Sequence, residues 1–101
     1  MAGASSIAPD VLARYAADAA REVAGVDALV GNALLRHEGV KVGREGDATS
    51  VEVHVALAWG ANAVEVGAAL QARVADTLAR MTEVGPVSVD VVIDEFRPPA
   101  A

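Results

Sequence analysis

Cysteine is absent from the chain, and aromatic residues make up only 3% of its 101 residues. The absence of cysteine excludes a disulfide framework, a thiolate metal site and a cysteine nucleophile. With so few aromatic side chains, a platform on which nucleic-acid bases stack is also excluded. Ala and Val supply most of the 53% hydrophobic content, so the core must be built from many small side chains.

Basic residues are also scarce, because 8 Lys and Arg stand against 14 Asp and Glu and the formal net charge is -6. A protein that binds nucleic acid concentrates basic residues to displace phosphate counterions, so neither nucleic acid nor direct contact with anionic lipid is expected. The longest run without a charged side chain, Val53 to Val64, is well short of the ~20 residues that span a bilayer. The N-terminal MAGASSIAP lacks the basic region of a signal peptide. These features predict a cytoplasmic protein that does not itself insert into a membrane.

A single domain is predicted over residues 1–101, with its core over about residues 7–96. The length suffices for one hydrophobic core but not for two. Both ends, MAGASS and RPPAA, are rich in small residues or proline and are expected to fray.

An amphipathic helix is predicted over about residues 9–23. Pro9 suits the first helical position, and Asp10 complements the helix dipole. Gly25 is a natural C-terminal stop. Apolar residues recur at helical spacing and define the face expected to be buried: Val11, Leu12, Tyr15, Ala16, Ala19 and Val23.

Residues 26–39 are interrupted by Gly31-Asn32, and a loop with at most one helical turn is expected there. From Gly39 the period changes to two, and GVKVGREGDATSVEVHVALAW predicts a strand, a turn at Glu45-Gly46-Asp47 and a second strand. The face expected to be buried comprises Val40, Val42, Val51, Val53, Val55, Leu57 and Trp59. The opposite face comprises Lys41, Ser50, Glu52, His54, Ala56 and Ala58.

A second helix is predicted from Asn62, which with Glu65 three residues later resembles a capping box, to about Thr82. Gly67 costs this helix about 1 kcal/mol relative to Ala, and a close approach to the sheet would explain it. The buried positions are expected at Val66, Leu70, Val74, Leu78 and Met81. A final strand, VSVDVVIDEF, is expected to direct Val87, Val89, Val91 and Ile93 inward.

The order α-β-β-α-β predicts an α+β two-layer sandwich, in which two helices cover one face of a three-stranded mixed sheet. The strands that flank the second helix should be parallel, because a strand–helix–strand unit crosses over right-handed. The other face of the sheet then has no helix to cover it. It is either solvated surface or a contact surface, and as a candidate interaction surface it comprises Glu52, His54, Ala56, Ala58, Asp90 and Val92.

The stretch WGANAVEVG, at the junction between strand and helix, is a candidate phosphate loop by its glycines and its place before a helix. It has neither the GxGxxG spacing of a dinucleotide site nor the Lys-Ser/Thr of a P-loop. We interpret it as a structural joint in which Trp59 closes the end of the core, Gly60 permits a tight turn and Asn62 caps the helix.

The residues do not assemble into a recognisable catalytic or metal site. A zinc site needs three or four converging ligands, and of the two histidines His37 falls in the expected loop and His54 on the uncovered face. Asp90, Asp94 and Glu95 cluster near the last strand, but an edge-facing acidic run is more often a solubility device than a catalytic pair. We therefore predict a protein that is not an enzyme and has no cofactor.

Four stretches of the chain match a known family: IAPDVLARYAADAAREVAGV at residues 7–26, GVKV at 39–42, VEVHVALAWGANAVEVGAALQARVADTLARMT at 51–82 and VSVDVVI at 87–93. Through them most of the chain, about residues 7–96, resembles the alkaline shock protein family of Gram-positive envelope stress proteins. The family typically has an I-x-P-x-V helix start, an E-V-x-G-V helix end and an aromatic-Gly-x-Asn joint before a long helix ending in Met-Thr. Two positions depart from that pattern: Trp59 stands where the family usually has Tyr, and Glu83 where it tends to have Gly.

The resemblance implies a non-enzymatic cytoplasmic protein that gathers at the membrane through an integral-membrane partner. It also implies self-association into a homo-oligomer and support of the envelope under stress. No catalytic residue is implied by it.

Two other classes have a similar order of elements. A metal–sulfur cluster assembly domain would fit the Pro-rich end EFRPPAA, but its activity is associated with a Cys that this chain lacks. A KH-type RNA module needs a GxxG loop and a basic groove, and WGAN and a charge of -6 provide neither.

Overall fold

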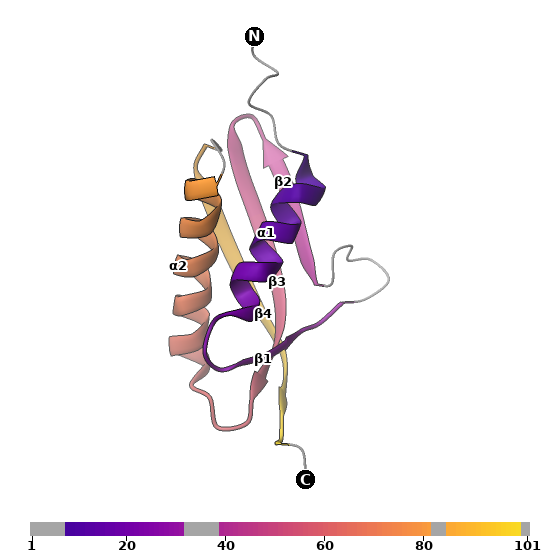
Figure 1. Cartoon of the computed structure of the whole chain (residues 1–101), viewed down its shortest axis with the longest axis vertical. Coiled ribbons are helices and arrows are strands. Elements are labelled where there is room, and N and C mark those ends of the chain that lie inside the picture. The colour runs from indigo at the N-terminus through magenta and orange to yellow at the C-terminus, as the bar shows by residue number, and fades with distance from the viewer. Residues whose placement is uncertain (1–7, 32–38, 82–84, 100–101) are drawn as a thin grey trace.

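The computed structural model describes residues 8–31, 39–81 and 85–99. Two helices cover one face of a four-stranded sheet (Figure 1). The elements follow the order α1 (Pro9–Arg21), β1 (Val26–Leu29), β2 (Val40–Glu45), β3 (Ala48–Ala58), α2 (Ala63–Met81) and β4 (Val87–Arg97). None of the helices in these ranges is long and apolar enough to cross a membrane.

β3 is the central strand, and it pairs antiparallel with β1 and β2 and parallel with β4. β1 and β2 lie along the same edge of β3, with β1 beside its C-terminal half and β2 beside its N-terminal half. Between them, Val30 N donates to His54 O at 2.9 Å, and His54 N donates to Gly39 O at 2.9 Å. β1 and β2 therefore lie end to end along one edge of β3. The chain leaves this edge after Val30 and returns to it at Gly39.

The α+β class with two helices is confirmed, whereas the expected sheet of three strands is corrected to four. The additional strand, β1, occupies four of the residues that were expected to form a loop. Its apolar pattern is too short to indicate a period, and its strand conformation is imposed by pairing with β3. The parallel pairing of the strands that flank α2 is observed along β3 and β4.

The core is built mainly from small side chains, as the composition requires. α1 ends at Arg21, two residues before the expected end, and its buried face is wider than predicted. Alanines at three further positions let α1 lie close to the sheet: Ala13, Ala17 and Ala20. The predicted inward residues of β3 and α2 are buried as expected: Val51, Val53, Val55, Leu57, Val66, Leu70, Val74 and Leu78.

Two expectations about α2 are wrong. Met81 is 56% exposed, because it lies at the end of the helix and lines the groove between α1 and α2 instead of the sheet. Gly67 does not mark a close approach to the sheet, since a Cβ built on it meets no atom of the described chain within 4 Å.

The joint after β3 is a turn followed by a cap, as expected, but Trp59 is not part of the core. Gly60 adopts φ +91°, and Asn62 Oδ1 accepts a hydrogen bond from Glu65 N at 3.0 Å at the start of α2. Trp59 is 68% exposed, which contradicts the prediction that it closes the core. β3 ends at Ala58, so Trp59 lies in the turn that leaves the sheet.

Candidate interaction surface

The sheet surface turned away from both helices is called the helix-free face. It carries the six residues predicted as a candidate surface: Glu52, His54, Ala56, Ala58, Asp90 and Val92. Side chains alternate along each strand, and the odd-numbered residues of β3 point into the core. The register of β3 and β4 sets Glu52 beside Asp90 and His54 beside Val92, so the structure brings these residues together.

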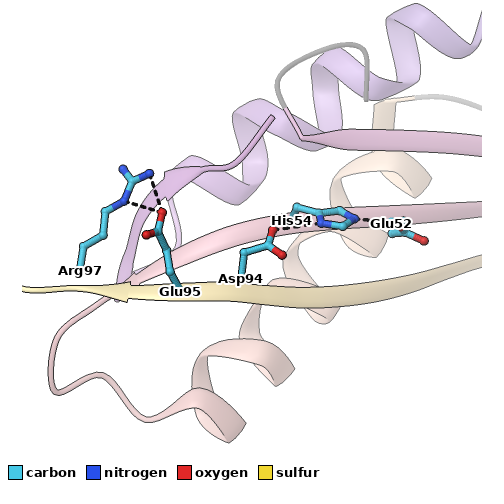
Figure 2. A network of polar contacts seen from close by, with 5 residues as sticks. All are labelled: Glu52, His54, Asp94, Glu95 and Arg97. Carbon is cyan, nitrogen blue, oxygen red and sulfur yellow. Dashed lines mark hydrogen bonds and ion pairs between the residues drawn. The ribbon is translucent and has the colours of Figure 1, made fainter. Parts of the chain in front are cut away.

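His54 links the two long strands through its side chain. Its Nε2 lies 2.6 Å from Oε2 of Glu52 on β3, and its Nδ1 lies 3.0 Å from Oδ2 of Asp94 on β4. Figure 2 shows the imidazole ring held between the two carboxylates. The side chain is only 15% exposed, so this residue of the helix-free face is a fixed part of the surface.

The carboxylates favour the protonated imidazolium. The hydrogen bond to Glu52 raises the pKa of His54 most, and Asp94 raises it further, against the opposing effect of burial. A neutral imidazole can donate a hydrogen bond from one nitrogen only, whereas an imidazolium donates from both. The arrangement therefore stabilises a positive charge between two negative ones.

Asp94 reaches His54 because β4 contains an irregularity. Val55 pairs with Ile93, but the next residue, Ala56, pairs with Glu95, so Asp94 is an additional residue in β4. Asp94 and Glu95 consequently both lie on the helix-free face. The sequence signals this irregularity, because apolar residues recur as far as Ile93 and resume only at Phe96.

Glu95 belongs to a second group of charges. Arg97 Nη2 lies 2.9 Å from Oε2 of Glu95, and Arg97 Nη1 lies 3.5 Å from Oδ2 of Asp27 in β1 (Figure 2 shows the Glu95–Arg97 pair). Asp27 was missed because β1 was expected to be a loop. Exposed ion pairs such as these contribute little to folding stability, so their main effect is to hold the charged groups in place.

Ala56 is not accessible, although it lies on the helix-free face. Its exposure is 0%, and in register it lies between Ala28 of β1 and Glu95 of β4. A methyl group on a sheet is shielded by longer neighbouring side chains. Asp90 is exposed, and Glu52, His54, Ala58 and Val92 are partly exposed, so these five remain available for contact.

A family model with a cell envelope-related function, that of the alkaline shock protein 23 family, matches residues 1–98. The chain belongs to the alkaline shock protein family. The resemblance seen in the sequence motifs is thereby confirmed.

Solved structures with the fold of this alkaline shock family member include several forms of the MamM CTD. A zinc form is 17% identical, with a TM-score of 0.62 and coverage of 90% of this chain and 86% of that chain. A nickel form is also 17% identical, with a TM-score of 0.60 and coverage of 85% and 99%. A form with a His-to-Glu substitution is 16% identical, with a TM-score of 0.63 and coverage of 90% and 95%. At these identities the likeness shows the fold alone, and no curated protein matches the chain.

The histidine site of this family member is arranged for ion pairing and not for chelation. Glu52 and Asp94 contact opposite nitrogens of the His54 ring, so the three side chains do not converge on one point. Within residues 8–31, 39–81 and 85–99 no group of three or more His, Cys, Asp and Glu side chains could hold a metal ion.

Proposed function

We propose that the chain is a small, self-associating interaction module of the cell envelope stress response. In this proposal it is not an enzyme, resides in the cytoplasm and is brought to the membrane by a partner protein. The envelope-related function of the family supports the setting. The observation that supports the mode of action is the helix-free face, a sheet surface with a fixed charge network and no helix of the described chain above it.

The partner docks on the helix-free face. Long charged side chains normally lose rotamer freedom when they bind, and this loss weakens binding. On this face Glu52 and Asp94 are already held by His54, and Glu95 by Arg97, so part of that ordering has occurred before binding. Carboxylates outnumber cations in this network, so the docking segment of the partner should supply basic or hydrogen-bond-donating groups.

Asp90→Lys tests this proposal, with Asp76→Lys as its control. Asp90 is exposed on the helix-free face and Asp76 is exposed on α2, so both variants change net charge equally and neither disturbs the core. The measurement is the fraction of chain that sediments with envelope membranes of the host, before and after protease treatment of those membranes. We expect a severalfold decrease for Asp90→Lys, little change for Asp76→Lys, and loss of binding on protease treatment.

Equal binding by Asp90→Lys and the native chain would exclude the helix-free face as the docking surface. Binding that survives protease treatment would point to lipid instead of a protein partner.

A further inference from the structure

β4 has one open edge. Among the described strands it pairs only with β3, and this pairing runs from Val87 to Arg97 with Asp94 left out. An open strand edge carries unpaired N–H and C=O groups and is a template for another strand. Figure 1 shows α2 lying over β4 at the side of the molecule away from β2, so this edge and one flank of α2 face outward together.

The backbone hydrogen bonds identify which peptide groups point outward. Thr49 pairs with Val87 and its N donates to Pro86 O at 2.8 Å, so Pro86 and the even-numbered residues after it face β3. The odd-numbered residues up to the irregularity, namely Val87, Val89, Val91 and Ile93, direct their peptide groups outward. Gln71 Nε2 donates to Val89 O at 3.1 Å, which places this flank of α2 directly over the open edge.

The flank of α2 above this edge has no charged residue. Residues at helical spacing form it: Val64, Ala68, Gln71, Ala75 and Ala79. Val64 is 82% exposed, and Ala68, Gln71 and Ala79 are exposed as well. Three of the charges of α2 lie toward α1, where Arg73 pairs with Glu22 and both Asp76 and Arg80 line the groove between the helices. An exposed, charge-free helix flank above an unpaired strand edge is typical of an interface.

We propose that a second copy of this chain binds here, with β4 pairing antiparallel to β4 and α2 packing against α2 about a twofold axis. The proposal rests on the proposed function in that it specifies where self-association occurs. It leaves the helix-free face of each copy available for the other partner.

The charges of β4 disfavour two of the symmetric registers. With Val91 opposite Val91 of the second copy, Asp90 lies opposite Val92 and Ser88 opposite Asp94. A shift of the centre to Val92 would set Asp90 against Asp94, and a shift to Asp90 would set Asp90 against itself. Like charges directly opposite one another destabilise strand pairs, so the register centred on Val91 is favoured over those centred on Asp90 and Val92.

The twofold axis of the proposed dimer also explains why α2 contains a glycine at position 67. α2 runs antiparallel to β4 (Figure 1), and Gln71 lies at the level of Val89. Val91 is about 7 Å farther along the strand, which corresponds to roughly four residues back along the helix and therefore to Gly67. A Cβ on Gly67 would meet no atom of the described chain within 4 Å, so Gly67 leaves room for the close approach of another helix.

The size of the flank predicts a weak dimer. The molecule is 17 Å thick along its shortest axis, and 19 residues of α2 extend about 28 Å. The flank therefore offers about 500 Å² per copy, which gives a total near the lower limit for specific interfaces. Dissociation in the micromolar to millimolar range is expected. Higher salt should strengthen the dimer, because each copy has a net charge of -6 and the interface itself is nearly uncharged.

Ala68→Arg and Ala69→Arg form a matched pair of variants for sedimentation equilibrium of the full chain from micromolar to millimolar concentration. Both alanines are exposed on α2, but Ala68 lies on the charge-free flank and Ala69 on the side that carries Arg73. Ala68→Arg brings two like charges together near the axis and should raise the dissociation constant about tenfold or more. Ala69→Arg should leave it close to the native value.

Amide exchange followed by NMR identifies the strand. The N–H groups of Val91 and Ile93 should exchange rapidly in dilute solution and become protected as the dimer forms, whereas that of Val92, which faces β3, should be protected throughout. A dimer that Ala68→Arg does not weaken, or in which Val91 and Ile93 stay unprotected, overturns the proposal. A chain that remains monomeric at millimolar concentration also overturns it. These measurements contain no membrane or partner, whereas the assay with Asp90→Lys measures membrane binding, so each proposal can fail while the other stands.

Discussion

At the scale of single residues, His54 should have the largest effect on the pH dependence of stability, because its ring contacts carboxylates on two strands. The pKa of His54 is raised above 6.5 in the folded chain, first by Glu52 and then by Asp94. A group whose pKa is raised on folding adds stability below its unfolded pKa, and this stability is lost as the pH rises through the folded pKa. Charged residues also flank Glu52 in register, namely Lys41 on β2 and Asp90 on β4.

We expect the free energy of unfolding to fall as the pH is raised from 6.5 through the higher folded pKa. Urea denaturation at a series of pH values measures this slope, and His54→Gln should remove it. NMR titration of the His54 ring should give a pKa above 6.5. A ring that titrates below that value would contradict the ion-pair geometry.

Trp59 illustrates how a residue type can mislead. The only Trp of a chain poor in aromatics suggests a core anchor, and a buried Trp replaced by Ala would cost about 3–5 kcal/mol. Its 68% exposure changes that expectation. Trp59→Ala should lower the free energy of unfolding by about 0.5 kcal/mol or less in dilute solution, as measured by urea denaturation. A loss of several kcal/mol would place the ring in a buried contact.

At the scale of the elements, the long periodic segments could be predicted and the short or irregular ones could not. α1, α2, β3 and most of β4 bury a face over many residues, so the period is legible in the sequence. The four residues of β1 form a strand only because β3 is beside them. The irregularity at Asp94 likewise depends on register between two strands distant in sequence.

The candidate site likewise has a part that could be predicted from the sequence and a part that could not. Strand alternation alone placed Glu52 and His54 on one face. The contact from Asp94 to His54 required the irregularity in β4, and the contact from Arg97 to Asp27 required β1. The expected interior position of Trp59 failed because alternation does not indicate where a strand ends.

Gly67, within α2, and Gly25, which precedes β1 and lies against α2, should respond in opposite ways to substitution by alanine. Gly67→Ala adds a helix-favouring residue in open space and should raise the free energy of unfolding by about 1 kcal/mol in dilute solution. Gly25→Ala should lower it by more than about 1 kcal/mol, because Gly25 has φ +95° and its Cβ would lie 2.7 Å from Cγ2 of Val66. Thermal and urea denaturation of both variants measures this. Similar losses for both would show that Gly67 is constrained within the single chain.

At the scale of the whole molecule, polar and apolar surfaces are distributed unequally. The helix-free face holds most of its charged groups in pairs, and the groove between α1 and α2 mixes both signs. The flank formed by α2 and the edge of β4 has almost no charge. A twofold dimer through that flank would continue the sheet and turn two acidic helix-free faces in the same general direction, so one assembly could engage two copies of a partner. Two linked contacts can exceed the affinity of either alone when both are reached at once.

The connection between β1 and β2 can vary in length without loss of a strand. The backbone of His54 in β3 is hydrogen-bonded to Val30, just after β1, and to Gly39, just before β2. Both ends of the connection are therefore fixed on β3. The sheet therefore does not set the number of residues between these two points, and a longer connection costs only about 0.6 kcal/mol for each doubling of its length. Related chains could accept an inserted segment there with every strand retained.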